Sequence, residues 1–309
     1  MITLTHSDIA QFLKCRRSWQ WGYIEDRTPP DRTTGALALG SRVHLCLEKF
    51  YLNGEDPIAT HDKIVADTIS ELELNGAPSW ELDQFYEDAI VGRNCCATYT
   101  DWLEESGADA GLTVDGVESM IETPILDGRV MLRGKVDVRF RRESDGALII
   151  NDFKTTGKAI NQITMELDRS YQAYVYAAIQ RRMTPDDYVI GGMYRIIKKV
   201  SRKQYGTTYV EERLVPGMAR SQVNVENQIF AICNEMASIL ERREQSDMDD
   251  VFYMSPGEHC VWCAFKNPCT IANENPAAAA DMLEDQYTSG RHRRYDSTPD
   301  MTKEEGDLT

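Results

Sequence analysis

The sequence predicts an α/β protein in which a mixed sheet is flanked by helices. Residues 130–140 alternate apolar and polar side chains, which is the two-residue period of a half-buried strand. Residues 141–146 (RRESDG) are a turn signal, and the apolar run ALIINDFK that follows predicts a returning strand. Segments with helical spacing lie on both sides of this hairpin, so the chain combines both kinds of element.

The other elements follow from their own patterns. Thr5 or Ser7 can cap a first helix within residues 4–26, where Ile9, Phe12 and Leu13 have helical spacing. Further helices are expected within residues 34–51, 58–106, about 161–182 and about 217–243, and further strands over 188–197 and 207–215. The expected organisation is a domain over residues 1–270, with a helical insertion at 54–118 and a cysteine segment at 255–270, followed by an acidic, disordered tail over 271–309.

The charge is unevenly distributed. The net charge is −16, but residues 54–118 alone hold 16 acidic and 2 basic residues, and residues 271–309 hold 9 acidic and 4 basic residues. The rest of the chain has 25 acidic and 28 basic residues. One face can therefore bind a polyanion while the acidic segments point elsewhere, because association depends on local potential. For residues 54–118 alone, a well-solvated surface is the simpler interpretation.

The amino-terminal sequence lacks the basic and apolar regions of a signal peptide. No apolar run approaches the roughly 18 residues that a membrane span needs. We therefore expect a cytoplasmic protein, in which the 8 cysteines are metal ligands, core residues or reactive thiols rather than disulfides.

Asp152 and Lys154 lie at the end of the returning strand and, two residues apart, project from the same face. If the hairpin turns near Ser144 and Asp145, antiparallel pairing brings Asp137 opposite Asp152. Two carboxylates this close repel each other unless a cation lies between them, and such oxygen ligands suit Mg²⁺ or Mn²⁺. On the DFK triplet alone, a salt bridge at a strand end is the simpler interpretation.

Four motifs occur in order along the chain: GSRVH (Gly40, His44), GKVD (Gly134, Asp137), DFK (Asp152, Lys154) and QAYVY (Gln172, Tyr176). Together they resemble the RecB-like branch of the PD-(D/E)xK nuclease superfamily, over residues 4–270 apart from the insertion. The most similar subgroup by pattern is the CRISPR-associated and phage-type exonucleases that carry an iron–sulfur cluster. The resemblance implies a restriction-endonuclease-like core with a mixed central sheet.

The resemblance also implies roles for individual residues. His44, Asp137 and Asp152 would bind the metal ion, and Lys154 would be the catalytic lysine. Gln172 and Tyr176, one helical turn apart, would position DNA or support the lysine. Members often carry another acidic residue upstream of GKVD, and here Glu122 is preferred over Glu118. One departure is that Arg16 follows Cys15, where the family usually has a proline.

Three cysteines, Cys260, Cys263 and Cys269, form a C-x2-C-x5-C run, one thiolate short of an iron–sulfur or zinc site. The resemblance makes Cys15 the fourth ligand of a [4Fe–4S] cluster that joins the two ends of the nuclease domain. Spacing alone leaves zinc open. The remaining cysteines, Cys46, Cys95, Cys96 and Cys233, are expected to be buried thiols.

The function implied is a metal-dependent deoxyribonuclease with exonuclease activity on single-stranded DNA or DNA ends. Its partners would be recombination or CRISPR-adaptation proteins. The alternative is a catalytically silent DNA-binding or assembly subunit with the same fold, but retention of all four catalytic residues argues against it. Candidate phosphate contacts are Lys14, Arg16, Arg17, Arg181, Arg182, Lys198, Lys199, Arg202 and Lys203.

Overall fold

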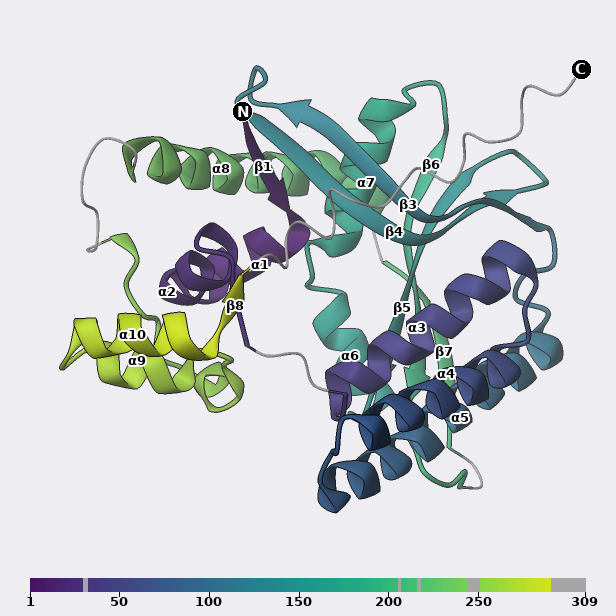
Figure 1. Ribbon diagram of the computed structural model, residues 1–309. Helices are drawn as coiled ribbons and strands as arrows, with labels where there is room; N and C mark the ends of the chain where they lie inside the picture. Colours follow the sequence, from purple (N-terminus) through teal and green to yellow (C-terminus); the bar gives the residue numbers. More distant parts are fainter. Residues whose placement is uncertain (30–32, 205–206, 216–217, 244–250, 290–309) are drawn as a thin grey trace, which may run out of the picture. The chain divides into compact units, whose positions relative to one another are not determined.

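The computed structural model describes residues 1–29, 33–204, 207–215, 218–243 and 251–289, and these divide into two compact units (Figure 1). We call Arg32–Thr123 with Gly134–Glu226 the central unit. Met1–Asp31, Pro124–Arg133 and Asn227–Thr309 form the terminal unit. The stretch expected to be one nuclease domain, residues 1–270, is therefore shared between two units.

The strands form the mixed sheet that the sequence predicted. Its order is β1-β4-β5-β6-β7, with β3 also paired to β4. The β4–β5 and β6–β7 pairs are antiparallel, whereas β5 and β6 are parallel. The strands are β3 (Leu112–Ile125), β4 (Val130–Arg142), β5 (Leu148–Thr156), β6 (Val189–Lys198) and β7 (Val210–Leu214). Strand β1 (Ile2–Thr5), which the sequence analysis missed, pairs in parallel with the first residues of β4 inside the terminal unit.

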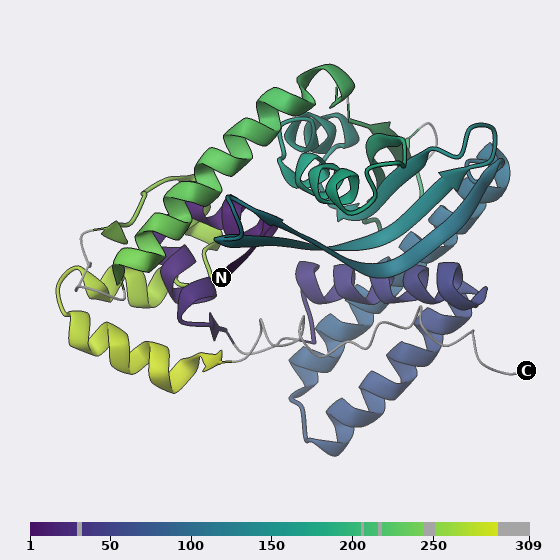
Figure 2. The same cartoon turned by 90° about the horizontal axis from the view of Figure 1, so that it is seen from above.

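Helices cover both faces of the strands in the central unit, with α3 and α7 on opposite sides (Figure 2). The core on the α3 side joins apolar residues of α3 and α5 to residues of the strands, including Phe140 and Phe153. Cys46, Cys95 and Cys96 are fully buried in this core, as expected. The helices of the central unit are α3 (Ala36–Asn53), α4 (Pro57–Leu74), α5 (Ser79–Ser106), α6 (Ile160–Leu167) and α7 (Gln172–Met183).

Two expected helical segments need correction. The acidic segment is two helices, α4 and α5, separated by a turn that contains Gly76 at φ 68°, and residues 112–118 already belong to strand β3. The helix expected over 161–182 is broken after Leu167. In the break, Asp168 accepts hydrogen bonds from Arg213 at 2.8 and 3.1 Å, and Ser170 Oγ accepts the backbone N–H of Gln172 at 3.2 Å. Helix α7 therefore begins at Gln172.

The terminal unit is built from both ends of the chain. Thr5 and Asp8 form a capping box at the start of α1 (His6–Lys14), so Thr5 is the cap. Leu13, expected on the apolar face, is 51% exposed. Trp21 packs with Phe265 and Leu283, and Trp19 is also buried, so both tryptophans serve the core. The other elements are α2 (Arg16–Trp19), the π-helix η1 (Gln20–Ile24), β2 (Arg27–Thr28), α8 (Met218–Arg243, whose first turns belong to the central unit), the 3₁₀-helix η3 (Glu258–Trp262), α9 (Lys266–Ala272), α10 (Pro276–Gln286) and β8 (Thr288–Ser289).

The expected tail is partly folded. Asn275 caps α10 by accepting the N–H of Ala278, Pro276 occupies the first turn, and Leu283 of this helix is buried. The first part of the segment is therefore ordered, and residues 290–309 lie outside the described residues. Within the described ranges, no helix is long and apolar enough to cross a membrane.

Candidate active site

The carboxylates of the GKVD and DFK motifs meet where the β4–β5 hairpin opens. Val138 pairs with Asn151, so the same register carried one residue further places Asp137 opposite Asp152. This is the pairing that the sequence predicted. The backbone N–H of Phe153 donates to Asp137 Oδ2 at 2.7 Å. The neighbouring strand therefore fixes the side chain of Asp137.

Asp152 lies between a cation and an amide donor. Lys154 Nζ contacts Asp152 Oδ2, and Gln172 Nε2 donates to Asp152 Oδ1 at 2.7 Å. The same amide nitrogen donates to Tyr176 Oη at 3.3 Å. The side chain of Asp152 is only 8% exposed. The ammonium of Lys154 thus offsets the charge of a nearly buried carboxylate, and the QAYVY motif orients that carboxylate.

His44 reaches the same place from α3. Its Nδ1 lies 3.5 Å from Asp137 Oδ2, and its ring packs edge-on against Phe153, with centroids 6.2 Å apart. Burial lowers the pKa of His44 to about 4, although the Asp152 carboxylate opposes the shift. The imidazole is therefore neutral at neutral pH and keeps a lone pair with which to ligate a metal ion.

Asp137 shows the opposite shift. Burial raises its pKa well above the ordinary 3.8, and the Asp152 carboxylate raises it further, whereas Lys154 opposes the change. Two carboxylates that share one site behave in this way when no metal ion lies between them. A bound cation would remove the electrostatic reason for the shift.

Gly134 of the GKVD motif and Gly40 of the GSRVH motif each lie close to a neighbouring element that leaves little room for a side chain. A Cβ on Gly134 would lie 2.6 Å from Tyr176 Cε1, so only glycine lets β4 pass the ring of Tyr176. A Cβ on Gly40 would lie 3.1 Å from Thr155 Oγ1, so this glycine lets α3 approach β5 beside Lys154. Both glycines bring motif residues together rather than taking part in chemistry.

The charge of Glu118 acts on the site, whereas the sequence analysis preferred Glu122 as the additional acidic residue. The charge of Glu118 contributes to the raised pKa of Asp137, and its carboxylate pairs with Lys135. Glu118 has φ 49°, a left-handed conformation that is unfavourable for a residue with a Cβ. Glu122 is exposed further along the same strand. Sequence spacing could not show that the charge of Glu118 acts on Asp137.

The residues of this site suit a hard divalent cation. No group of three or more His, Cys, Asp or Glu is arranged to hold a metal ion as the described residues stand. The donor set is nevertheless a neutral imidazole and two neighbouring carboxylates, one of which has a strongly raised pKa. Nitrogen and oxygen donors of this kind match Mg²⁺ or Mn²⁺.

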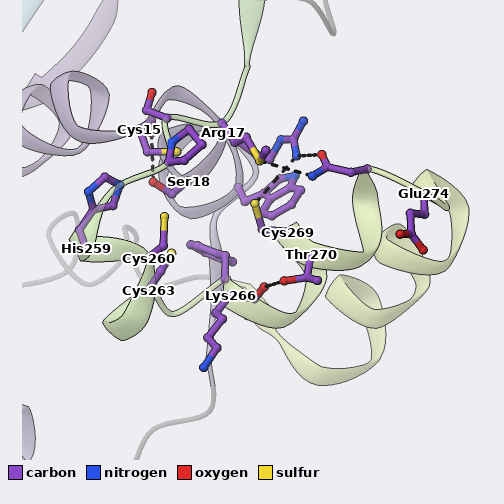
Figure 3. A pocket seen from close by; sticks show the side chains of 16 residues that line it. Cys15, Arg17, Ser18, His259, Cys260, Cys263, Lys266, Cys269, Thr270 and Glu274 are labelled. Atoms are coloured by element: carbon purple, nitrogen blue, oxygen red, sulfur yellow. Dashed lines mark hydrogen bonds between the residues drawn. The ribbon is translucent and has the colours of Figure 1, made fainter.

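The four predicted cysteine ligands line one cavity in the terminal unit, with a volume of about 400 Å³ (Figure 3). Cys15 follows α1, Cys260 and Cys263 lie in and directly after η3, and Cys269 belongs to α9. Burial raises the pKa of the Cys15 thiol, but hydrogen bonds from Ser18, Ser255 and Arg17 outweigh burial and lower it overall. This environment favours the thiolate, which is the form that binds metals. Cys233 is fully buried and is not among the residues that line the cavity.

Most of the candidate phosphate contacts have partners within the protein. Arg16 pairs with Glu235, Arg181 and Arg182 lie near Glu226, and Lys203 pairs with Asp101. The ammonium groups of Lys198 and Lys199 donate to backbone carbonyls. Basic residue type alone could not reveal these pairings.

Comparison with models of known protein families matches residues 3–270 to the PD-(D/E)XK nuclease superfamily. A search of curated proteins finds no significant match. The match includes all four motifs, whose residues belong to the central unit, and the four cysteines, which belong to the terminal unit.

Proposed function

Because the chain belongs to the PD-(D/E)XK nuclease superfamily, we propose that it is a metal-dependent DNA exonuclease of the RecB-like branch. The observation that carries the proposal is the meeting of His44, Asp137 and Asp152 beside Lys154 in the central unit. A purely structural salt bridge would need only one carboxylate for the lysine. The second carboxylate and the neutral histidine are what a metal site adds.

His44, Asp137 and Asp152 would hold the divalent cation. When bound, such an ion lowers the pKa of a water molecule and stabilises the charge that develops on a phosphate. Lys154 contacts Asp152, so its ammonium lies beside the proposed metal ligands. There it would stabilise negative charge on a phosphate bound at this site.

Gln172 has a positioning role in this scheme. Its amide nitrogen donates to both Asp152 and Tyr176, at 2.7 and 3.3 Å. It therefore fixes the orientation of Asp152 beside Lys154. Tyr176 is set by its packing on Gly134, so the QAYVY motif connects the GKVD and DFK strands.

The substrate proposed is single-stranded DNA or a DNA end, in DNA recombination, repair, phage DNA processing or CRISPR adaptation. The order of the four motifs and the presence of four cysteines support this narrower assignment, because together they resemble the exonucleases with an iron–sulfur cluster.

The cysteine site is proposed to hold a [4Fe–4S] cluster. The four cysteines line one cavity of about 400 Å³, and their order along the chain resembles that of the exonucleases with a cluster. The cluster would join Cys15 to the carboxyl-terminal cysteines and supply folding energy to the terminal unit.

The test is degradation of DNA labelled at one end or the other, single-stranded or double-stranded, with and without Mg²⁺ or Mn²⁺. We expect cleavage only with added metal, and none by Lys154→Ala prepared in the same way. Lys158→Ala is a suitable control, because Lys158 lies beyond the strand and pairs with Glu166. If Lys154→Ala cleaves as fast as the unaltered protein, the proposed active site is wrong. If the unaltered protein binds DNA but does not cut it, the silent subunit is the correct interpretation.

A further inference from the structure

Arg17 contributes a positive charge to the wall of the cysteine cavity (Figure 3). Its Nη1 donates to Asn273 Oδ1 at 2.9 Å and to Cys269 Sγ at 3.9 Å. Its guanidinium carbon lies 5.9 Å from the ring centroid of Trp21. Asn273 and Trp21 therefore hold this guanidinium beside the sulfur of one predicted ligand, Cys269.

The charge of Arg17 has no carboxylate partner among the ion pairs of the described residues. The neighbouring Arg16 differs in this respect. It pairs with Glu235, its guanidinium lies 4.7 Å from the ring centroid of Phe12, and it does not line the cavity. Two adjacent arginines thus have different roles, and only Arg17 faces the thiols.

Apart from the cysteines, few residues that line the cavity can carry negative charge. Lys266 and His259 line the cavity with Arg17, and Glu274 is the single carboxylate among the lining residues. Glu274 lies on the far side of the cavity from Cys15 and Cys260 (Figure 3). The cavity therefore suits an anionic group held through sulfur.

We propose that Arg17 is a positioning and charge-compensating residue for the group that the four cysteines bind. This inference rests on the proposed cysteine site. A [4Fe–4S] core with four thiolates is dianionic, and one-electron reduction makes it more negative. A guanidinium that donates to a ligand sulfur stabilises both states, and the reduced state more, so Arg17 raises the reduction potential and slows loss of the cluster.

The test compares Arg17→Gln, Arg17→Lys and Arg16→Gln, all purified without oxygen. Iron and sulfide per chain are measured, and the visible absorption is followed during titration with dithionite and redox mediators. We expect Arg17→Gln to have a more negative midpoint potential than the unaltered protein and to lose iron faster in air. Arg17→Lys should be intermediate, because it keeps the charge but not the planar guanidinium whose Nη1 reaches both Asn273 and Cys269. Arg16→Gln should match the unaltered protein.

An unchanged potential and unchanged iron retention in Arg17→Gln would overturn the proposal. If that variant fails to fold, Asn273→Ala takes its place, because it removes the acceptor that orients Arg17 and should shift the potential in the same direction. Zinc without sulfide in the unaltered protein would refute the cluster alone. The role of Arg17 is then decided by a chelator, which should remove zinc faster from Arg17→Gln than from Arg16→Gln. Absence of any bound metal would refute both proposals.

Discussion

The active site and the cysteine site differ in how their charges are balanced. In the active site, Lys154 contacts Asp152, the backbone of Phe153 donates to Asp137, and His44 is neutral. The protein therefore supplies one counter-charge, Lys154, for two carboxylates. The cysteine site has four thiols around a cavity and one guanidinium that donates to a sulfur.

The two sites also differ in how the fold brings them together. Three of the four proposed catalytic residues lie on one hairpin, at positions 137–154, and the fourth, His44, belongs to α3. The cysteine site joins Cys15 to residues 260–269, from the other end of the chain. We infer that the active site forms without its metal ion, whereas the terminal unit depends on its bound group for stability. The predictions that follow test this difference.

The largest effect on activity is expected from Asp152→Ala. Removal of a metal-binding carboxylate should reduce cleavage by about 10³-fold or more, while the melting temperature changes little, because Lys154 is partly exposed and can be solvated. Activity with Mg²⁺ and thermal unfolding followed by circular dichroism measure the two effects.

Asp145→Ala is the matched control for this variant, since Asp145 is an exposed aspartate in the turn of the same hairpin and pairs with Arg142. It should keep its activity. Unfolding of Asp152→Ala at 25 °C would contradict the idea that the active site forms without help from its metal ion.

Cys15→Ala should have the largest effect on stability. Loss of one thiolate leaves the proposed cluster with three ligands, and we expect colour, iron and solubility to be lost together. Cys233→Ala, also in the terminal unit, should keep its iron and lose only about 1–2 kcal/mol through the small cavity that it creates. Iron and sulfide analysis of protein purified without oxygen measures the outcome. Full iron content in Cys15→Ala would remove that residue from the ligand set.

The sequence predicted the parts of the fold that depend on local pattern. The alternation at residues 130–140 and the hairpin turn were enough to place Asp137 opposite Asp152, because register follows from turn position. Strand β1 was missed, since its four residues pair in parallel with a strand about 130 positions away. The break before Gln172 was missed too, because it depends on the distant Arg213. Glu118 was ranked below Glu122 because spacing does not reveal which carboxylate acts on Asp137.

A smaller effect is expected from pH on metal binding. The pKa of Asp137 is raised well above 3.8 without metal, so a proton competes with the cation at this carboxylate. Lowering the pH should weaken metal binding in a range where an isolated aspartate would already be ionised. His44, with a pKa of about 4, stays neutral through that range. Cleavage should therefore fall on the acid side, with a midpoint that moves to lower pH as Mg²⁺ is raised.

Pre-steady-state cleavage at several Mg²⁺ concentrations between pH 5 and 8 measures that midpoint. A midpoint that is independent of Mg²⁺ concentration would contradict competition at Asp137. It would indicate that the acid limb belongs to a group outside the metal site.

The smallest effect is expected from surface charge in the central unit. Lys203 pairs with Asp101, whereas Arg202 takes part in no ion pair of the described residues. If Arg202 and Lys203 contact phosphate, replacing both with Gln should weaken binding of single-stranded DNA. The slope of log affinity against log salt should then become less steep by about 0.7 for each lost contact.

Reversing the exposed charges of Asp67, Glu71 and Glu73 on α4 is the matched comparison, and it should change affinity little if that helix is turned away from DNA. Fluorescence anisotropy over a series of salt concentrations, with Asp152→Ala as background to prevent cleavage, measures both slopes. A larger change in DNA affinity in the α4 variant than in the Arg202 and Lys203 variant would mean that DNA binds on the acidic side of the central unit. Repulsion by the carboxylates of α4 would then weaken its binding there.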